Sequence, residues 1–123
     1  MKTIFSMIVP ALLGVGCVGS YPAPTQPLVD AQAAERSAKE LGAADQPAAQ
    51  LHLKLAEEQI AQAKLSLDAG DNKRAENLLV RARADAELAL ALAREQGANV
   101  EAQRATEQAN TMRSTNASQG AQQ

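Results

Sequence analysis

Three stretches with different patterns of apolar and polar residues follow one another along the chain. Residues 1–16 contain a continuous apolar run, residues 17–27 are rich in proline and glycine, and from residue 28 onward apolar positions recur every three or four residues. Such recurrence is typical of helices that bury one face. The pattern predicts an all-α fold, either a short antiparallel helical hairpin or a three-helix bundle, behind a leader and a tether.

Turn-forming residues set the expected limits of the first two helices. The first is predicted over about residues 29–41, where Gly42 ends it. The second is predicted over about 47–69, because Asp45 is a suitable N-cap and Pro47 fits the first turn.

A third helix is predicted over about residues 71–96, between the stop signal Gly70 and a Gly-Ala-Asn segment. At that segment we expect a break or kink, followed by a weaker and more polar helix at 100–112. Residues 113–123 offer no apolar set to bury and are predicted to be disordered. The helical domain is thus expected to span residues 28–112.

Each of the first three helices has an apolar stripe that predicts its buried face. In the first helix the stripe consists of Val29, Ala33, Ser37 and Leu41. In the second it consists of Leu53, Ala56, Ile60, Ala63 and Leu67. In the third it consists of Ala75, Leu79, Ala82, Ala86, Ala89 and Ala93. The last two stripes alternate spacings of three and four, as the seams of coiled coils do.

Further leucines on the third helix suggest a surface for a partner. Leu88, Leu90 and Leu92 lie on the flanks of the predicted seam. A helix with apolar residues on several faces either touches more than one neighbour or exposes an apolar strip. We therefore take Leu79, Leu88, Leu90 and Leu92 as the candidate interaction face.

Composition argues against several kinds of function. The only aromatic residues are Phe5 and Tyr21, so the helical region has no ring for stacking on bases or sugars. The net charge is −2, and positive and negative residues are interspersed. The sequence therefore lacks the basic stripe of nucleic-acid-binding proteins. Charged residues are spaced to pair along the helix surface, namely Glu35 with Lys39, Arg81 with Asp85 and Arg83 with Glu87.

No arrangement of residues typical of an active site or a cofactor site is found in the sequence. His52 is the only histidine, and a helical metal site needs at least two such ligands at suitable spacing. Glu57 and Glu58 are adjacent, so they diverge by about 100° around a helix and do not form a facing acid pair. We expect no enzymatic activity, no small-molecule substrate, no metal and no cofactor.

The leader has the features of a bacterial export signal. Lys2 precedes an apolar run that extends from Ile4 through Leu13, too short for a stable membrane span. The sequence Leu13-Gly14-Val15-Gly16-Cys17 resembles the lipobox of bacterial lipoproteins, although Gly14 stands where leucine is usual. This resemblance implies removal of residues 1–16 and covalent lipid attachment at Cys17.

An alternative is cleavage after Ser20, which would discard Cys17 and release a protein that starts at Tyr21. With the lipid at Cys17, residues 17–27 are expected to form an extended tether, since Pro22, Pro24 and Pro27 disfavour a helix. About ten extended residues reach roughly 30 Å. A tether of that length would hold the helices clear of a membrane.

The helical region also resembles a family known only as domain of unknown function 4398, small alanine-rich envelope lipoproteins. The resemblance covers roughly residues 30–95 and rests on the run from Leu55 to Ala93, which includes Ala69-Gly70-Asp71 and Ala84-Asp85-Ala86-Glu87-Leu88-Ala89. It implies an exported, lipidated helical hairpin or bundle and no activity. Gly70-Asp71 with the following helix is similar, more weakly, to one turn of a tetratricopeptide repeat.

These features favour a lipid-anchored module of the cell envelope that faces the periplasm and binds another protein or itself. Val18 after the cysteine favours the outer membrane. A soluble periplasmic carrier or chaperone-like protein is one alternative, and a structural spacer of the envelope is another.

Overall fold

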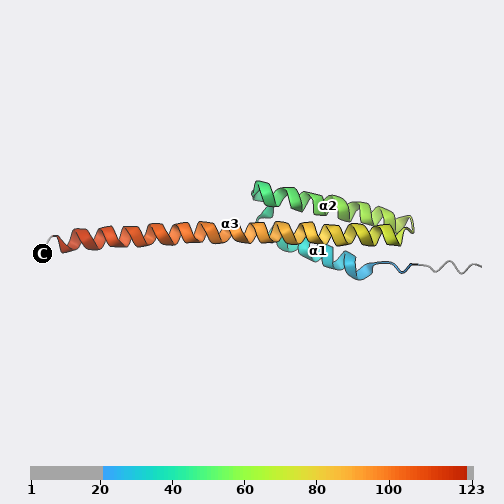
Figure 1. Cartoon of the computed structure of the whole chain (residues 1–123), viewed down its shortest axis with the longest axis horizontal. Helices are drawn as coiled ribbons and strands as arrows, with labels where there is room; N and C mark the ends of the chain where they lie inside the picture. Colours follow the sequence, from blue (N-terminus) through green and yellow to red (C-terminus); the bar gives the residue numbers. More distant parts are fainter. Residues whose placement is uncertain (1–20, 122–123) are drawn as a thin grey trace, which may run out of the picture.

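The computed structural model describes residues 21–121, and the predicted leader and Cys17 lie outside these residues. Three α-helices and one short 3₁₀ turn are present in this part of the chain: α1 (Thr25–Glu40), η1 (Ala43–Asp45), α2 (Pro47–Asp68) and α3 (Asn72–Gly120). The predicted all-α class is confirmed. Figure 1 shows α1 and α2 side by side with the first half of α3, while the second half of α3 extends alone.

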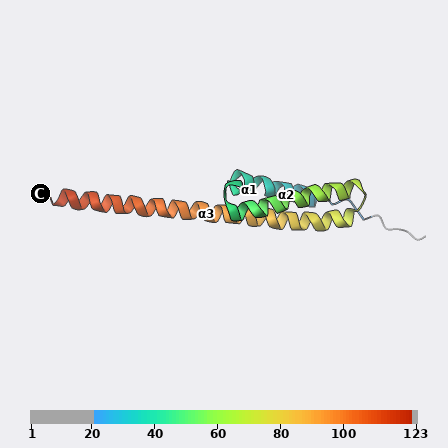
Figure 2. The ribbon, with the colours of Figure 1, turned by 90° about the horizontal axis from the view of Figure 1, so that it is seen from above.

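The bundle is organised around α3. Both α1 and α2 pack mainly on α3 and touch each other less. Figure 2, seen from above, shows α2 running opposite to α1 and α3. This up-down-up order follows from the two short connections, since short loops join neighbouring antiparallel helices.

A Schellman motif joins α2 to α3. Gly70 has φ 76°, and its N–H donates to the carbonyl of Leu67 at 2.9 Å. The N–H of Asp71 donates to the carbonyl of Ser66 at 2.8 Å, while its side chain accepts from the N–H of Arg74 at 3.1 Å. The same turn therefore ends one helix and caps the next.

Two glycine substitutions are expected to have opposite effects. Gly70→Ala places a side chain at positive φ and is expected to cost about 1 kcal/mol of the free energy of unfolding. Gly97 lies within a helix, and a side chain added there would meet open space. Gly97→Ala is therefore expected to raise the helical content. Thermal unfolding followed by circular dichroism measures both, and a loss of helix in Gly97→Ala would contradict the helical conformation at this position.

The core is narrow and made mostly of alanine. The second and third predicted seams are confirmed except at Leu67, which is half-buried. Of the fourteen buried apolar residues between positions 21 and 121, eleven are alanine, and the larger three are Leu53, Ile60 and Leu79. Alanine allows the helix axes to approach closely but adds little apolar area. Leu79 is the only fully buried large side chain of the described residues.

The predicted stripe of the first helix is wrong. Val29 and Leu41 are 53% and 48% exposed, whereas Ala31 and Ala38 are fully buried and Leu28 packs against the core. The buried face follows small residues because α1 lies close to α3, and the larger aliphatic residues that suggested the stripe point to solvent.

The start of α1 also differs from the prediction that residues 17–27 form a tether. The helix begins at Thr25, so Pro27 lies within its first turn, and the N–H of Leu28 already donates to the carbonyl of Pro24 at 3.2 Å. Proline is compatible with this turn because the first N–H groups of a helix have no partner inside it. Within the described part of the predicted tether, only residues 21–24 are non-helical.

The break expected after residue 96 and the disordered tail from 113 are both replaced by continuous helix. α3 runs through Gly97 to Gly120. One exposed glycine costs a helix only about 1 kcal/mol, and no proline is present to stop it. Side-chain hydroxyls bond back to carbonyls one turn earlier, as Thr106 does to Ala102 at 2.9 Å and Ser118 to Ser114 at 2.9 Å. The polar tail thus satisfies its hydrogen bonds locally.

Candidate interaction surfaces

The leucines proposed as an interaction face do not form one. Leu79 has no exposed surface and belongs to the core. Leu90 and Leu92 are half-buried against the second core cluster, and only Leu88 is exposed, at 43%. The third helix contacts α1, α2 and η1, and Leu90 and Leu92 pack partly against the core cluster that it shares with them. These four leucines therefore do not provide a surface for a partner.

His52 joins α2 to α3 in a small polar network. Its Nδ1 lies 3.0 Å from Oδ1 of Asp85, and Nε2 of Gln59 donates to Oδ2 of the same carboxylate at 2.7 Å. All three side chains are partly buried, and Oε1 of Gln59 is buried with no hydrogen-bond partner among the residues that the structure describes. This network replaces the Arg81–Asp85 pairing that the spacing favours. Among residues 21–121 no group of three metal-ligating side chains is present.

Lys39 links α1 to α2 through two carboxylates. Its Nζ lies 2.6 Å from Glu35 Oε1, as the spacing predicts, and 2.6 Å from Glu57 Oε1 on the neighbouring helix. These two hydrogen bonds raise the pKa of Lys39 above its ordinary value. The predicted pair of Arg83 and Glu87 is also formed, at 2.7 Å.

The Lys39 bridge predicts a loss of stability at high pH. A raised pKa means that the charged lysine stabilises the fold below its ordinary pKa of 10.5, and that this contribution disappears as the pH rises through the raised value. Because Lys39 is 45% exposed, the contribution is expected to stay below about 1 kcal/mol.

Thermal unfolding of Lys39→Met and of the parent chain from neutral to alkaline pH tests this expectation. The difference between their midpoints should be present at neutral pH and shrink in the alkaline range. Lys64→Met is the matched control, because Lys64 is exposed and forms no ion pair in the part of the chain that the structure describes. A difference that grows with pH would contradict the bridge.

The first described residue is fastened to the start of α3. Nδ2 of Asn72 donates to the backbone carbonyl of Tyr21 at 2.6 Å, and the Tyr21 hydroxyl donates to Oε2 of Glu76. That hydrogen bond raises the pKa of Tyr21. Tyr21 is only four residues beyond Cys17, a span of at most about 14 Å of extended chain. A lipid on Cys17 would therefore lie within about 14 Å of the bundle along the extended chain, rather than the roughly 30 Å expected from residues 17–27.

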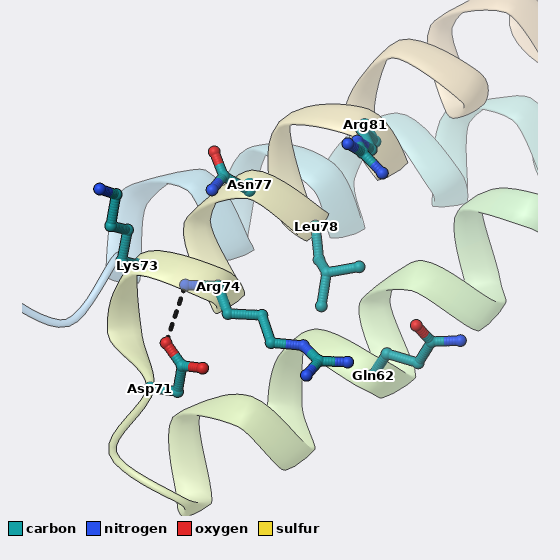
Figure 3. Close-up of a pocket in the computed structure, with 7 residues that line it drawn as sticks. All are labelled: Gln62, Asp71, Lys73, Arg74, Asn77, Leu78 and Arg81. Carbon is teal, nitrogen blue, oxygen red and sulfur yellow. Dashed lines mark hydrogen bonds between the residues drawn. The ribbon is translucent and has the colours of Figure 1, made fainter.

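A basic hollow lies between α2 and α3 near this attachment (Figure 3). Its volume is about 510 Å³, and it is lined by Gln62, Asp71, Lys73, Arg74, Asn77, Leu78 and Arg81. Figure 3 shows Arg74 extending from α3 toward Gln62 of α2, with Leu78 beside it. No run of basic residues in the sequence marks this place, because the charges are separated by helical turns.

The second half of α3 is a free helical arm, here defined as residues 97–120. No residue of α3 beyond Ala93 is buried. At 1.5 Å per residue the arm is about 36 Å long. One face of it has a seam of small apolar residues at spacings of four and three: Ala98, Ala102, Ala105, Ala109 and Met112. Met112 is 65% exposed. The prediction of a weak polar helix at residues 100–112 did not include this seam, although its spacing is visible in the sequence.

No protein-family model, curated protein or solved structure matches this chain. None of the helices between residues 21 and 121 combines the length and apolar character that a membrane span requires. The similarity to the envelope lipoproteins of domain of unknown function 4398 therefore stays a prediction. The class that the fold defines is a small three-helix bundle with a projecting helical arm.

Proposed function

We propose that this protein is a lipid-anchored, non-enzymatic module of the cell envelope that faces the periplasm and uses its helical arm to bind another envelope protein or a second copy of itself. The proposed anchor is an acylated Cys17, and the proposed membrane is the outer one. The support for the anchor is the lipobox-like sequence ahead of Tyr21.

The observation that carries the proposal is the direction of the arm. Tyr21 is fastened beside Asn72, at the end of the bundle where α2 turns into α3. The arm leaves the bundle at the opposite end, and its tip lies far from that turn (Figure 1). A chain held to a membrane at its N-terminal end would thus present the arm away from the membrane.

The arm is also the part of the protein that gains most from a partner. A single helix in water buries none of its apolar residues, and most helix stability in proteins comes from tertiary packing. The small residues of its seam allow a second helix to approach closely, as in coiled-coil contacts. A binding helix docked along this seam would cover Met112 and the alanines together.

Photo-crosslinking in cells tests this function. A photoreactive residue at Ala105 on the seam is expected to give an adduct with an envelope protein or with a second copy of the chain. The same residue at Val29, which is 53% exposed on the bundle, is the matched control and is expected to give little. No adduct from Ala105, or equal adducts from both positions, would contradict a binding role of the arm.

Two other functions lead to different results in the same cells. A soluble periplasmic carrier would be recovered outside the membrane fraction with an unmodified N-terminus at Tyr21. A structural spacer would also give adducts between copies of the chain, but it would give none with another envelope protein and would sediment in detergent as a stable elongated oligomer.

A further inference from the structure

The basic hollow contains more positive charge than its surroundings neutralise. Lys73, Arg74 and Arg81 line it, and Asp71 is the only carboxylate among its lining residues. Oδ1 of Asp71 already accepts the N–H of Arg74, since Asp71 caps α3. None of the three cations takes part in an ion pair within residues 21–121. Their charges are therefore available to an anion.

The spacing of the two arginines suits a phosphate group. Arg74 and Arg81 are seven residues apart, so they lie on one face of α3 about 10 Å apart along its axis. Leu78 lies between them, and Gln62 lines the hollow from α2 (Figure 3). A guanidinium group binds phosphate oxygens through two parallel hydrogen bonds.

The position of the hollow favours a membrane lipid over a free ion. Asn72, which holds Tyr21, lies next to Lys73 in the chain, so the hollow is at the end of the bundle nearest to the proposed anchor. Leu65 is 70% exposed and lines an adjoining hollow together with Arg74. Exposed apolar side chains beside basic ones are typical of surfaces that rest on anionic membranes.

We propose that the basic hollow binds the phosphate group of an anionic membrane lipid and so holds the α2–α3 end of the bundle against the membrane, with the arm directed away from it. This inference rests on the proposed membrane attachment of the chain ahead of Tyr21. Lipid binding at the basic hollow would add a second membrane contact to the covalent anchor. Two contacts fix the orientation of the bundle relative to the membrane, which one flexible anchor leaves free.

Nuclear magnetic resonance of the arginine side chains tests the proposal. The full chain, kept in an uncharged detergent, is titrated with micelles that contain phosphatidylglycerol, and in parallel with phosphatidylcholine and with inorganic phosphate. We expect saturable shifts of the Nε–Hε signals of Arg74 and Arg81 with phosphatidylglycerol only. The exposed Arg36 on α1 is the internal control and is expected to shift little.

Two double variants with the same change of charge complete the test. Arg74→Gln with Arg81→Gln is expected to weaken binding to the phosphatidylglycerol micelles by about fivefold for each charge removed. Arg36→Gln with Arg94→Gln changes two exposed arginines outside the hollow and is expected to leave binding unchanged.

Three results would overturn the proposal: equal shifts at Arg36, equal weakening by both double variants, or saturation by inorganic phosphate as readily as by the lipid. None of these readouts requires acylation of Cys17. Failure of the lipid site is thus separate from failure of the anchor, which the mass of the N-terminal peptide measures.

Discussion

Leu79→Ala is expected to destabilise the bundle more than any other single truncation of a side chain. Leu79 has no exposed surface and contacts the core cluster that includes Ala31, Ile60 and Ala75. The other buried members of this cluster are alanines apart from Ile60, and alanine has no flexible side chain with which to fill the space that the change leaves. The expected cost is about 3 kcal/mol, a large part of the stability of a small domain.

This change should lower the unfolding midpoint by about 12 to 24 °C, since 1 kcal/mol shifts a domain of this size by several degrees. The matched control is Val80→Ala, one residue further along α3, where the side chain is 61% exposed. It is expected to change the free energy of unfolding by less than about 0.5 kcal/mol. Similar losses from both variants would contradict the register of α3 in the bundle.

Truncation after Gln96 is the second change with a large expected effect. It removes the whole arm but no buried residue, because burial ends at Ala93. The helical signal in circular dichroism should fall by about a quarter, in proportion to the residues lost from the helices. The unfolding midpoint should stay nearly unchanged, since the arm does not contribute to the core.

In cells the truncated chain should remain in the same fraction as the full chain, while the partner that is cross-linked from Ala105 is no longer recovered with it by affinity purification. A single substitution, Ala105→Glu, is a milder form of the same test, because it places a charge in the seam and keeps the arm helical. A clear fall of the unfolding midpoint on truncation would show instead that the arm belongs to the folded core.

The sequence predicted the packing of α2 and α3 well because both follow a regular three-four spacing between clear stop and cap residues. The seam from Ala75 to Ala93 is buried at all six predicted positions. The stripe of α1 could not be found in the same way, because its buried residues are the small Ala31 and Ala38, and one of the half-buried residues between them is the charged Glu35. The size of an apolar side chain does not indicate the buried face of a helix where the helices meet through alanine.

The candidate sites were harder to predict, because each depends on contacts between distant residues. The attachment of Tyr21 to Asn72 and Glu76 joins positions more than 50 residues apart. Gln62 lines the basic hollow with Arg74 and Arg81 only because the turn at Gly70 folds α2 back along α3. The seam of the arm depends on no such contact, so it can be predicted from the spacing of its residues in the sequence alone.

The mass of the mature N-terminal peptide, taken from protein extracted from membranes, decides whether Cys17 carries a lipid anchor. We expect a peptide that begins at an acylated Cys17 and that is lost in a Cys17→Ser variant. An unmodified peptide that begins at Tyr21 would contradict the lipid anchor and leave the soluble carrier as the better description.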